Sequence, residues 1–87
     1  MNLADAKAQF QSIVERHRDD MPLDATTRAV ALAELTNTYQ HAMQKIDRFT
    51  AEQRGRRPGF LPMNTRNGLV GKLNRLCSSA KAELGLD

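Results

Sequence analysis

Apolar residues recur along this chain with the period of an α-helix rather than that of a strand. Between residues 3 and 19 they are spaced three and four positions apart, which places them on one helical face. The spacing predicts a first helix over residues 3–19. The helix ends before Pro22, because the residue that precedes a proline disfavours the α conformation. The predicted inward face comprises Leu3, Ala6, Phe10, Ile13, Val14 and His17.

A second, longer periodic segment follows Asp24, which is a favourable N-cap residue, and predicts a helix over residues 25–53. Its apolar positions keep a heptad-like register, and the helix would be about 43 Å long. One short neighbour cannot cover a stripe of this length and width. We therefore expect an interface with a protein partner or a second copy, formed by Leu32, Leu35, Tyr39, Ile46 and Phe49.

Residues 54–62 contain two prolines and two glycines, which predicts a loop. A third helix is expected over residues 65–84, capped by Asn64 or Thr65 and ended by Gly85. Its inward face would comprise Leu69, Val70, Leu73, Leu76, Cys77, Ala80 and Leu84.

Gly68 and Gly71 fall near the start of this third helix and leave two interpretations open. They could allow a close approach to a partner helix or a phosphate. Alternatively, Asn67 and Gly68 form a turn and the helix starts later, which we favour because glycine destabilises a helix interior by ~1 kcal/mol relative to alanine.

The composition agrees with a helical fold. The chain has 87 residues, of which 40% are hydrophobic and 26% charged, as in a single small soluble domain spanning residues 1–87. β-Branched and aromatic residues, which favour sheets, are sparse outside the helical patterns. We predict an all-α, three-helix bundle-like domain with a long central helix, a shorter first helix and an antiparallel third helix.

The net charge of +3 conceals a concentration of basic residues over residues 54–75, where six occur and no acid does. Positive charge just beyond a helix C-terminus is favourable by itself, but six basic residues exceed what helix capping requires. Such a stretch is typical of a surface that binds an anionic partner. The candidate binding residues are Arg54, Arg56, Arg57, Arg66, Lys72 and Arg75.

The segment Arg54-Gly55-Arg56-Arg57-Pro58 resembles the AT-hook core Arg-Gly-Arg-Pro, in which extended arginines enter the minor groove of DNA. It departs from that core by an additional arginine before the proline, which shifts the alternation of the side chains. We do not assign the chain to that family.

Catalytic and metal-binding motifs are absent from the sequence, so we expect a non-enzymatic protein with no cofactor and no metal. His17 and Asp20 could supply two ligands, but a transition-metal site needs three or four. Cys77 is the only cysteine and is expected to be a buried core thiol. No apolar run is long enough to span a bilayer, and the N-terminus does not resemble a signal peptide. We expect a cytoplasmic location.

These observations support two functional hypotheses. The first is a small, regulatory interaction module that binds a protein partner, or itself as a homodimer, through the predicted long-helix interface. The second is a nucleic-acid-binding regulator that contacts phosphates through residues 54–75. The composition indicates neither a membrane partner nor a small-molecule substrate.

Overall fold

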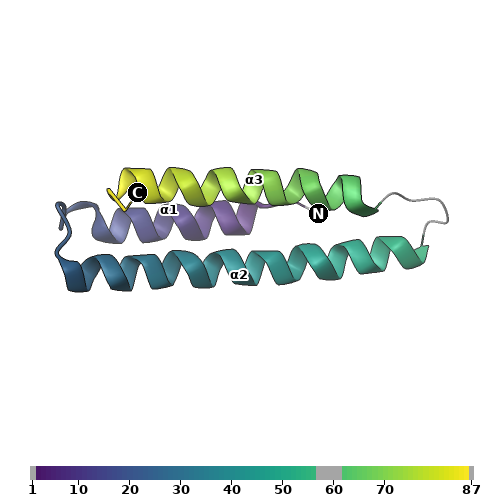
Figure 1. Ribbon diagram of the computed structural model, residues 1–87, viewed down its shortest axis with the longest axis horizontal. Coiled ribbons are helices and arrows are strands. Elements are labelled where there is room, and N and C mark those ends of the chain that lie inside the picture. The colour runs from purple at the N-terminus through teal and green to yellow at the C-terminus, as the bar shows by residue number, and fades with distance from the viewer. Residues whose placement is uncertain (1, 57–61, 87) are drawn as a thin grey trace.

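The computed structural model describes residues 2–56 and 62–86 of the chain. Three helices follow one another in this part: α1 (Ala4–Arg18), α2 (Ala25–Arg56) and α3 (Pro62–Glu83). No strand occurs among the described residues. The predicted all-α fold is confirmed, with a long central helix and an antiparallel third helix (Figure 1).

The molecule is a rod of 51 × 18 × 15 Å. At 1.5 Å per residue the 32 residues of α2 extend for about 48 Å, so α2 runs the whole length of the rod. α1 has only 15 residues, and it begins near the middle of α2, where Leu3 shares surface hollows with Lys45 of α2 and Lys72 of α3.

The rod therefore divides into two halves (Figure 1). We call residues 2–42 and 76–86 the three-helix half, because α1 there packs against both long helices. We call residues 43–56 and 62–75 the two-helix half. In the described part of the chain, only α2 and α3 accompany each other along this second half.

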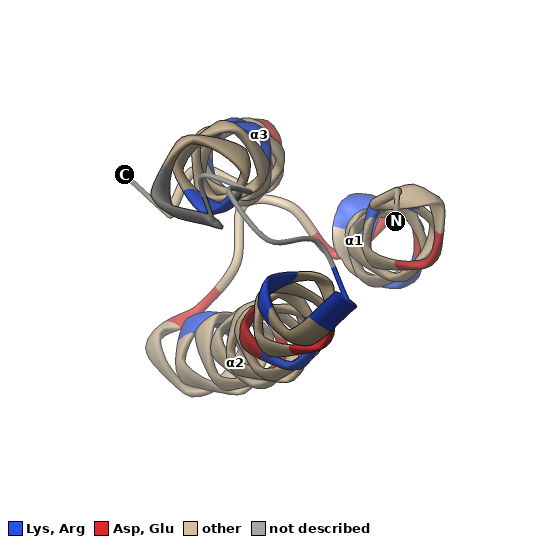
Figure 2. Ribbon diagram, turned by 90° about the vertical axis from the view of Figure 1, so that its right-hand side faces the viewer, with Lys and Arg blue, Asp and Glu red and all other residues tan. Residues whose placement is uncertain are grey.

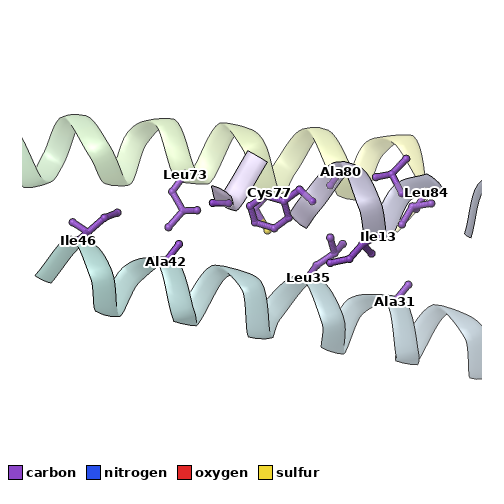
Figure 3. Close-up of a cluster of buried hydrophobic side chains, with 12 residues drawn as sticks. Ile13, Ala31, Leu35, Ala42, Ile46, Leu73, Cys77, Ala80 and Leu84 are labelled. Carbon is purple, nitrogen blue, oxygen red and sulfur yellow. The ribbon is translucent and has the colours of Figure 1, made fainter. Parts of the chain in front are cut away.

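The hydrophobic core lies along the axis of the rod and is built from all three helices (Figure 3). Leu35 and Ile46 of α2 and Leu73 of α3 have no exposed surface. Small residues lie between these large ones and let the helices approach closely. The buried apolar residues are Ala6, Phe10, Ile13, Val14, Ala31, Leu35, Ala42, Ile46, Leu73, Cys77, Ala80 and Leu84.

Two of the predicted helix ends are confirmed. The Asp24 carboxylate accepts a hydrogen bond of 2.7 Å from the backbone N–H of Thr27, and this bond lowers the pKa of Asp24. Gly85 has a φ of +67° and follows the end of α3. The Leu86 N–H donates to the Lys81 carbonyl at 2.8 Å, which is the Schellman arrangement that glycine favours.

Other helix ends differ from the prediction. α1 spans Ala4–Arg18, one residue shorter at each end than the predicted 3–19, and its N-cap is Leu3. The Asn2 side chain accepts a hydrogen bond of 3.1 Å from the Ala4 N–H. α2 continues through Gly55 to Arg56 instead of ending at residue 53.

The start of α3 also needs correction. α3 begins at Pro62, so Asn64 and Thr65 lie within its first turn and do not cap it. Proline is favoured at the first helical position, because its missing N–H has no partner there in any case. α3 passes through Gly68, and the favoured interpretation of an Asn67-Gly68 turn is wrong.

Neither glycine of α3 makes a close helix contact. A Cβ atom at Gly68 would meet nothing within 4 Å, and one at Gly71 would meet only Arg75 of the same helix, at 3.8 Å. Within the single chain, no other helix therefore approaches closely at either glycine.

The buried face of α2 is also rotated from the predicted stripe. Leu32 retains 42% and Val30 50% of its surface. Ala31 and Thr38 are buried instead, and the Thr38 hydroxyl donates to the Glu34 carbonyl at 3.1 Å. A hydroxyl satisfied within its own helix can be buried at little cost, which is why a threonine fits this face.

Candidate interaction surface

The two halves of the rod differ sharply in charge. Over residues 43–75, eight lysines and arginines stand against two acids, a net charge of +6. The rest of the chain holds five basic residues and eight acids, a net charge of −3. Figure 2 views the molecule from the end of the two-helix half, with Lys and Arg in blue. A charge separation of this size along one rod produces a positive field at one end and a negative field at the other.

Arg54 and Arg56 are exposed in the last turn of α2. Arg57, the third predicted arginine of this group, lies outside the described residues. Arg54, Gly55 and Arg56 are helical, so their side chains do not alternate along an extended strand. The AT-hook resemblance therefore does not carry over to the conformation of these three residues.

Arg66 differs from the other basic residues because it is already paired. Its Nε donates to the Asp47 carboxylate at 2.8 Å, and about a third of its side chain is exposed. This contact ties the start of α3 to α2. Arg66 therefore has a structural partner within the chain and is less available to an external anion than Arg54 or Arg56.

Lys72 and Arg75 lie on the exposed surface of α3, where it passes the start of α1. There they line a groove of about 330 Å³ together with Lys7 of α1. Lys72 and Arg75 were predicted from the sequence, and the structure adds Lys7 to them.

The basic surface also continues along α2. Lys45 lines a hollow next to Leu3. Arg48, Glu52 and Arg56 follow it at helical spacings of three and four, so all four residues lie on one side of α2. Nearer the start of α2, the same side faces α1. Lys45 and Arg48 are exposed and were not among the predicted residues. The helical spacing of Lys45 and Arg48 with Arg56 could have indicated from the sequence that they share one face of the helix.

The predicted long-helix interface is mostly used within the chain itself. Leu35 and Ile46 are completely buried, and Tyr39 and Phe49 are half-buried. The Tyr39 hydroxyl donates to Asn74 Oδ1 of α3 at 2.7 Å. Among the five predicted interface residues only Leu32 is exposed. In the folded single chain Leu35 and Ile46 thus belong to the core, and Tyr39 packs against it and joins α2 to α3.

One polar cluster joins α1 to α2 in the three-helix half. Glu34 pairs with Arg16, and its Oε1 lies 2.9 Å from His17 Nε2. The hydrogen bond from His17, assisted by Arg16 and opposed by partial burial, lowers the pKa of Glu34. His17 lies in the last turn of α1, where a carboxylate on the neighbouring helix positions it.

Metal ligands, the cysteine and membrane-spanning helices can be considered over the described part of the chain. There, no group of three or more His, Cys, Asp or Glu side chains could hold a metal ion. Cys77 is a free thiol and is buried, as predicted. None of the described helices combines the length and the apolar character that crossing a membrane requires.

Comparison with known proteins adds no family assignment. No protein family, no curated protein and no solved structure matches this chain significantly.

Proposed function

We propose that this chain is a non-enzymatic helical interaction module with a regulatory role, and that it binds an acidic protein partner through the basic two-helix half. The observation that carries the proposal is the net charge of +6 over residues 43–75, beside a net charge of −3 over the rest of the chain. Opposite potentials attract a partner from a distance and orient it on encounter.

The division of the rod supports this assignment. The three-helix half contains most of the buried side chains, and its one ion-paired cluster holds α1 in place. Of the basic residues in the two-helix half, only Arg66 has an ion-pair partner in the described part of the chain. Exposed charges that make no internal contact contribute little to stability, so binding explains their concentration better than folding does.

An apolar element favours a protein partner over nucleic acid. Leu3 and Leu76 form part of the groove that Lys72 and Arg75 line. A phosphate backbone offers no apolar side chain that could pack against Leu3 and Leu76, whereas a protein segment can bury apolar side chains beside its charges.

Nucleic-acid binding remains the second candidate, and it is favoured by the exposure of Arg54 and Arg56 at the end of α2. Arginines at the end of a rod can contact successive phosphates. In this case binding would be insensitive to sequence.

A titration with two anionic probes separates these candidates. Poly-L-glutamate offers carboxylates on a polypeptide, and random-sequence duplex DNA offers phosphates. Each would be titrated between about 50 and 200 mM salt, where phosphate-driven affinity falls steeply. We expect salt-dependent binding of poly-L-glutamate that weakens several-fold in Arg54→Ala with Arg56→Ala.

The matched control is Arg18→Ala with Arg28→Ala, which removes two exposed arginines from the three-helix half and should leave binding unchanged. Tighter binding of DNA, with a salt slope that falls by about 0.9 for each lost phosphate contact, would assign the nucleic-acid function instead. Absence of binding to both probes at the lowest salt would contradict the proposal.

A further inference from the structure

The groove between the start of α1 and the middle of α3 combines two chemistries. Leu3, Ala4 and Leu76 supply apolar surface, and three basic residues surround it, namely Lys7, Lys72 and Arg75. No acid is among the lining residues. None of these three cations forms an ion pair with another described residue. A complementary ligand must therefore offer an apolar side chain flanked by carboxylates.

The groove continues into a neighbouring hollow. A second hollow of about 230 Å³ shares Lys7, Leu76 and Ser79 with it and reaches Glu83 along the crevice between α1 and α3. The basic residues are thus gathered at one end of a crevice that an extended segment of polypeptide can follow.

The chain itself contains a segment of the required chemistry. Residues 19–24, which connect α1 to α2, hold three aspartates and no basic residue. Met21 in their midst retains 41% of its surface, one of the most exposed large apolar side chains in the described structure. Asp19 and Asp20 are exposed, and no ion pair joins either carboxylate to the rest of the described chain.

A single copy cannot bring these two features together. Lys7 and Asp19 lie twelve positions apart, a distance of about 18 Å along α1, and the contacts of Arg16 and His17 with Glu34 hold α1 against α2. A second copy lying antiparallel alongside the first would place its own connecting segment at the groove. By symmetry it would receive the segment of the first copy in its own groove.

We propose that two copies of this chain pair antiparallel along their α1–α3 faces, with residues 19–24 of each copy seated in the basic groove of the other. Met21 occupies the apolar floor beside Leu3 and Leu76, and Asp19 and Asp20 face Lys72 and Arg75. The contact is closed, because each copy gives one segment and receives one. This inference deepens the proposed function and rests on it, since it identifies the acidic partner as a second copy.

The test is the mass of the particle in solution, measured by light scattering at about 100 μM protein and about 50 mM salt, conditions that reveal micromolar association. We expect twice the 9.7 kDa of one chain. Raising the salt to about 500 mM should dissociate the pair, because exposed charges are then screened. Met21→Ser should weaken the pairing about tenfold, through loss of its buried apolar surface.

Two charge reversals sharpen the test. Lys72→Glu with Arg75→Glu gives the groove the charge of the segment, and Asp19→Lys with Asp20→Lys gives the segment the charge of the groove. Each variant alone should be monomeric, because like charges then meet in both contacts. A mixture of the two should form a heterodimer, because both of its contacts are again between opposite charges.

Lys81→Glu is the control, since it reverses the charge of a residue that lines a hollow beside Tyr39 of α2 and does not line the groove, and it should leave the pair intact. A monomeric wild type at low salt would overturn the inference, as would a dimer that survives both reversals. Circular dichroism of each variant shows whether its helices persist. A monomer that still binds poly-L-glutamate would retain the proposed function while the pairing fails.

Discussion

The three-helix half and the two-helix half share α2 and α3 but bury very different amounts of apolar surface. Phe10, Ile13 and Val14 of α1 fill the first half and are all buried. Among the residues of the second half whose burial the structure describes, only Ile46 and Leu73 are completely buried, while Phe49, Leu69 and Val70 are half-buried. Stability should therefore reside in the three-helix half.

The charges divide in the opposite sense. Residues 43–75, which include the two-helix half, carry a net charge of +6, and the rest of the chain, which includes the three-helix half, carries −3. Like charges gathered on a two-helix hairpin repel one another and destabilise it. The comparison shows that one half supplies most of the buried core, and the proposed function assigns the binding of an anionic partner to the other half.

The strongest test of this division compares two phenylalanines. Phe10→Ala should cost about 3–5 kcal/mol, because the side chain is buried on all sides. Phe49→Ala should cost clearly less, since its side chain is only half-buried. Urea denaturation of both variants measures the difference. Equal losses would contradict the unequal packing of the two halves.

A second comparison tests the register of α2. Leu35→Ala removes a side chain with no exposed surface and should cost about 2–5 kcal/mol. Leu32→Ala, on the same helix but 42% exposed, should stay within about 0.5 kcal/mol of the wild type. Comparable losses would instead support the stripe that the sequence predicts, which contains both residues. Their ratio is read from the same urea curves.

A substitution in the two-helix half should increase stability. Gly68 lies inside α3, and a Cβ atom there has open space around it. Gly68→Ala should therefore stabilise the fold by about 0.5–1 kcal/mol, through the higher helix propensity of alanine. The expected rise in Tm is a few degrees, detected by thermal unfolding. A lower Tm would mean that α3 does not continue through this position.

The last prediction concerns the pH dependence of the contact that Glu34 makes between α1 and α2. Because the folded-state pKa of Glu34 lies below its ordinary value of 4.5, the carboxylate stabilises the fold above that pH, and the contribution is lost as the pH falls through the lowered pKa. Glu34→Gln should therefore be the less stable protein near pH 6, by up to ~1 kcal/mol. The gap should close as the pH falls through the lowered pKa of Glu34. A gap that is independent of pH would show that packing, not charge, makes this contact.

Large apolar residues made most of the fold predictable. The inward faces of α1 and α3 follow from Phe10, Ile13, Leu73 and Leu84, whose spacing leaves one choice of face. The buried face of α2 was predictable only in part, because it uses Ala31 and Thr38 beside Leu35 and Ile46. Small residues give a weak hydrophobic signal and are buried only where two helices approach closely.

The candidate site was predictable only in part. The basic residues of α3 stand out in the sequence, but nothing in their spacing reveals that Arg66 is paired with Asp47. Lys7 does not stand out in the sequence, because residues 1–24 around it hold three basic residues against five acids. The groove joins residues from the two ends of the chain, so only the folded arrangement of α1 against α3 brings them together.

The central claim is that the basic two-helix half is the binding surface, and residue-resolved NMR tests it most directly. Amide resonances would be followed while poly-L-glutamate is added at low salt. We predict that the shifts gather at residues 45–56 and 64–75 and at Lys7, and that the buried positions around Leu35 and Leu84 do not respond. Shifts concentrated in the rest of the three-helix half, or no shifts at all, would contradict the account.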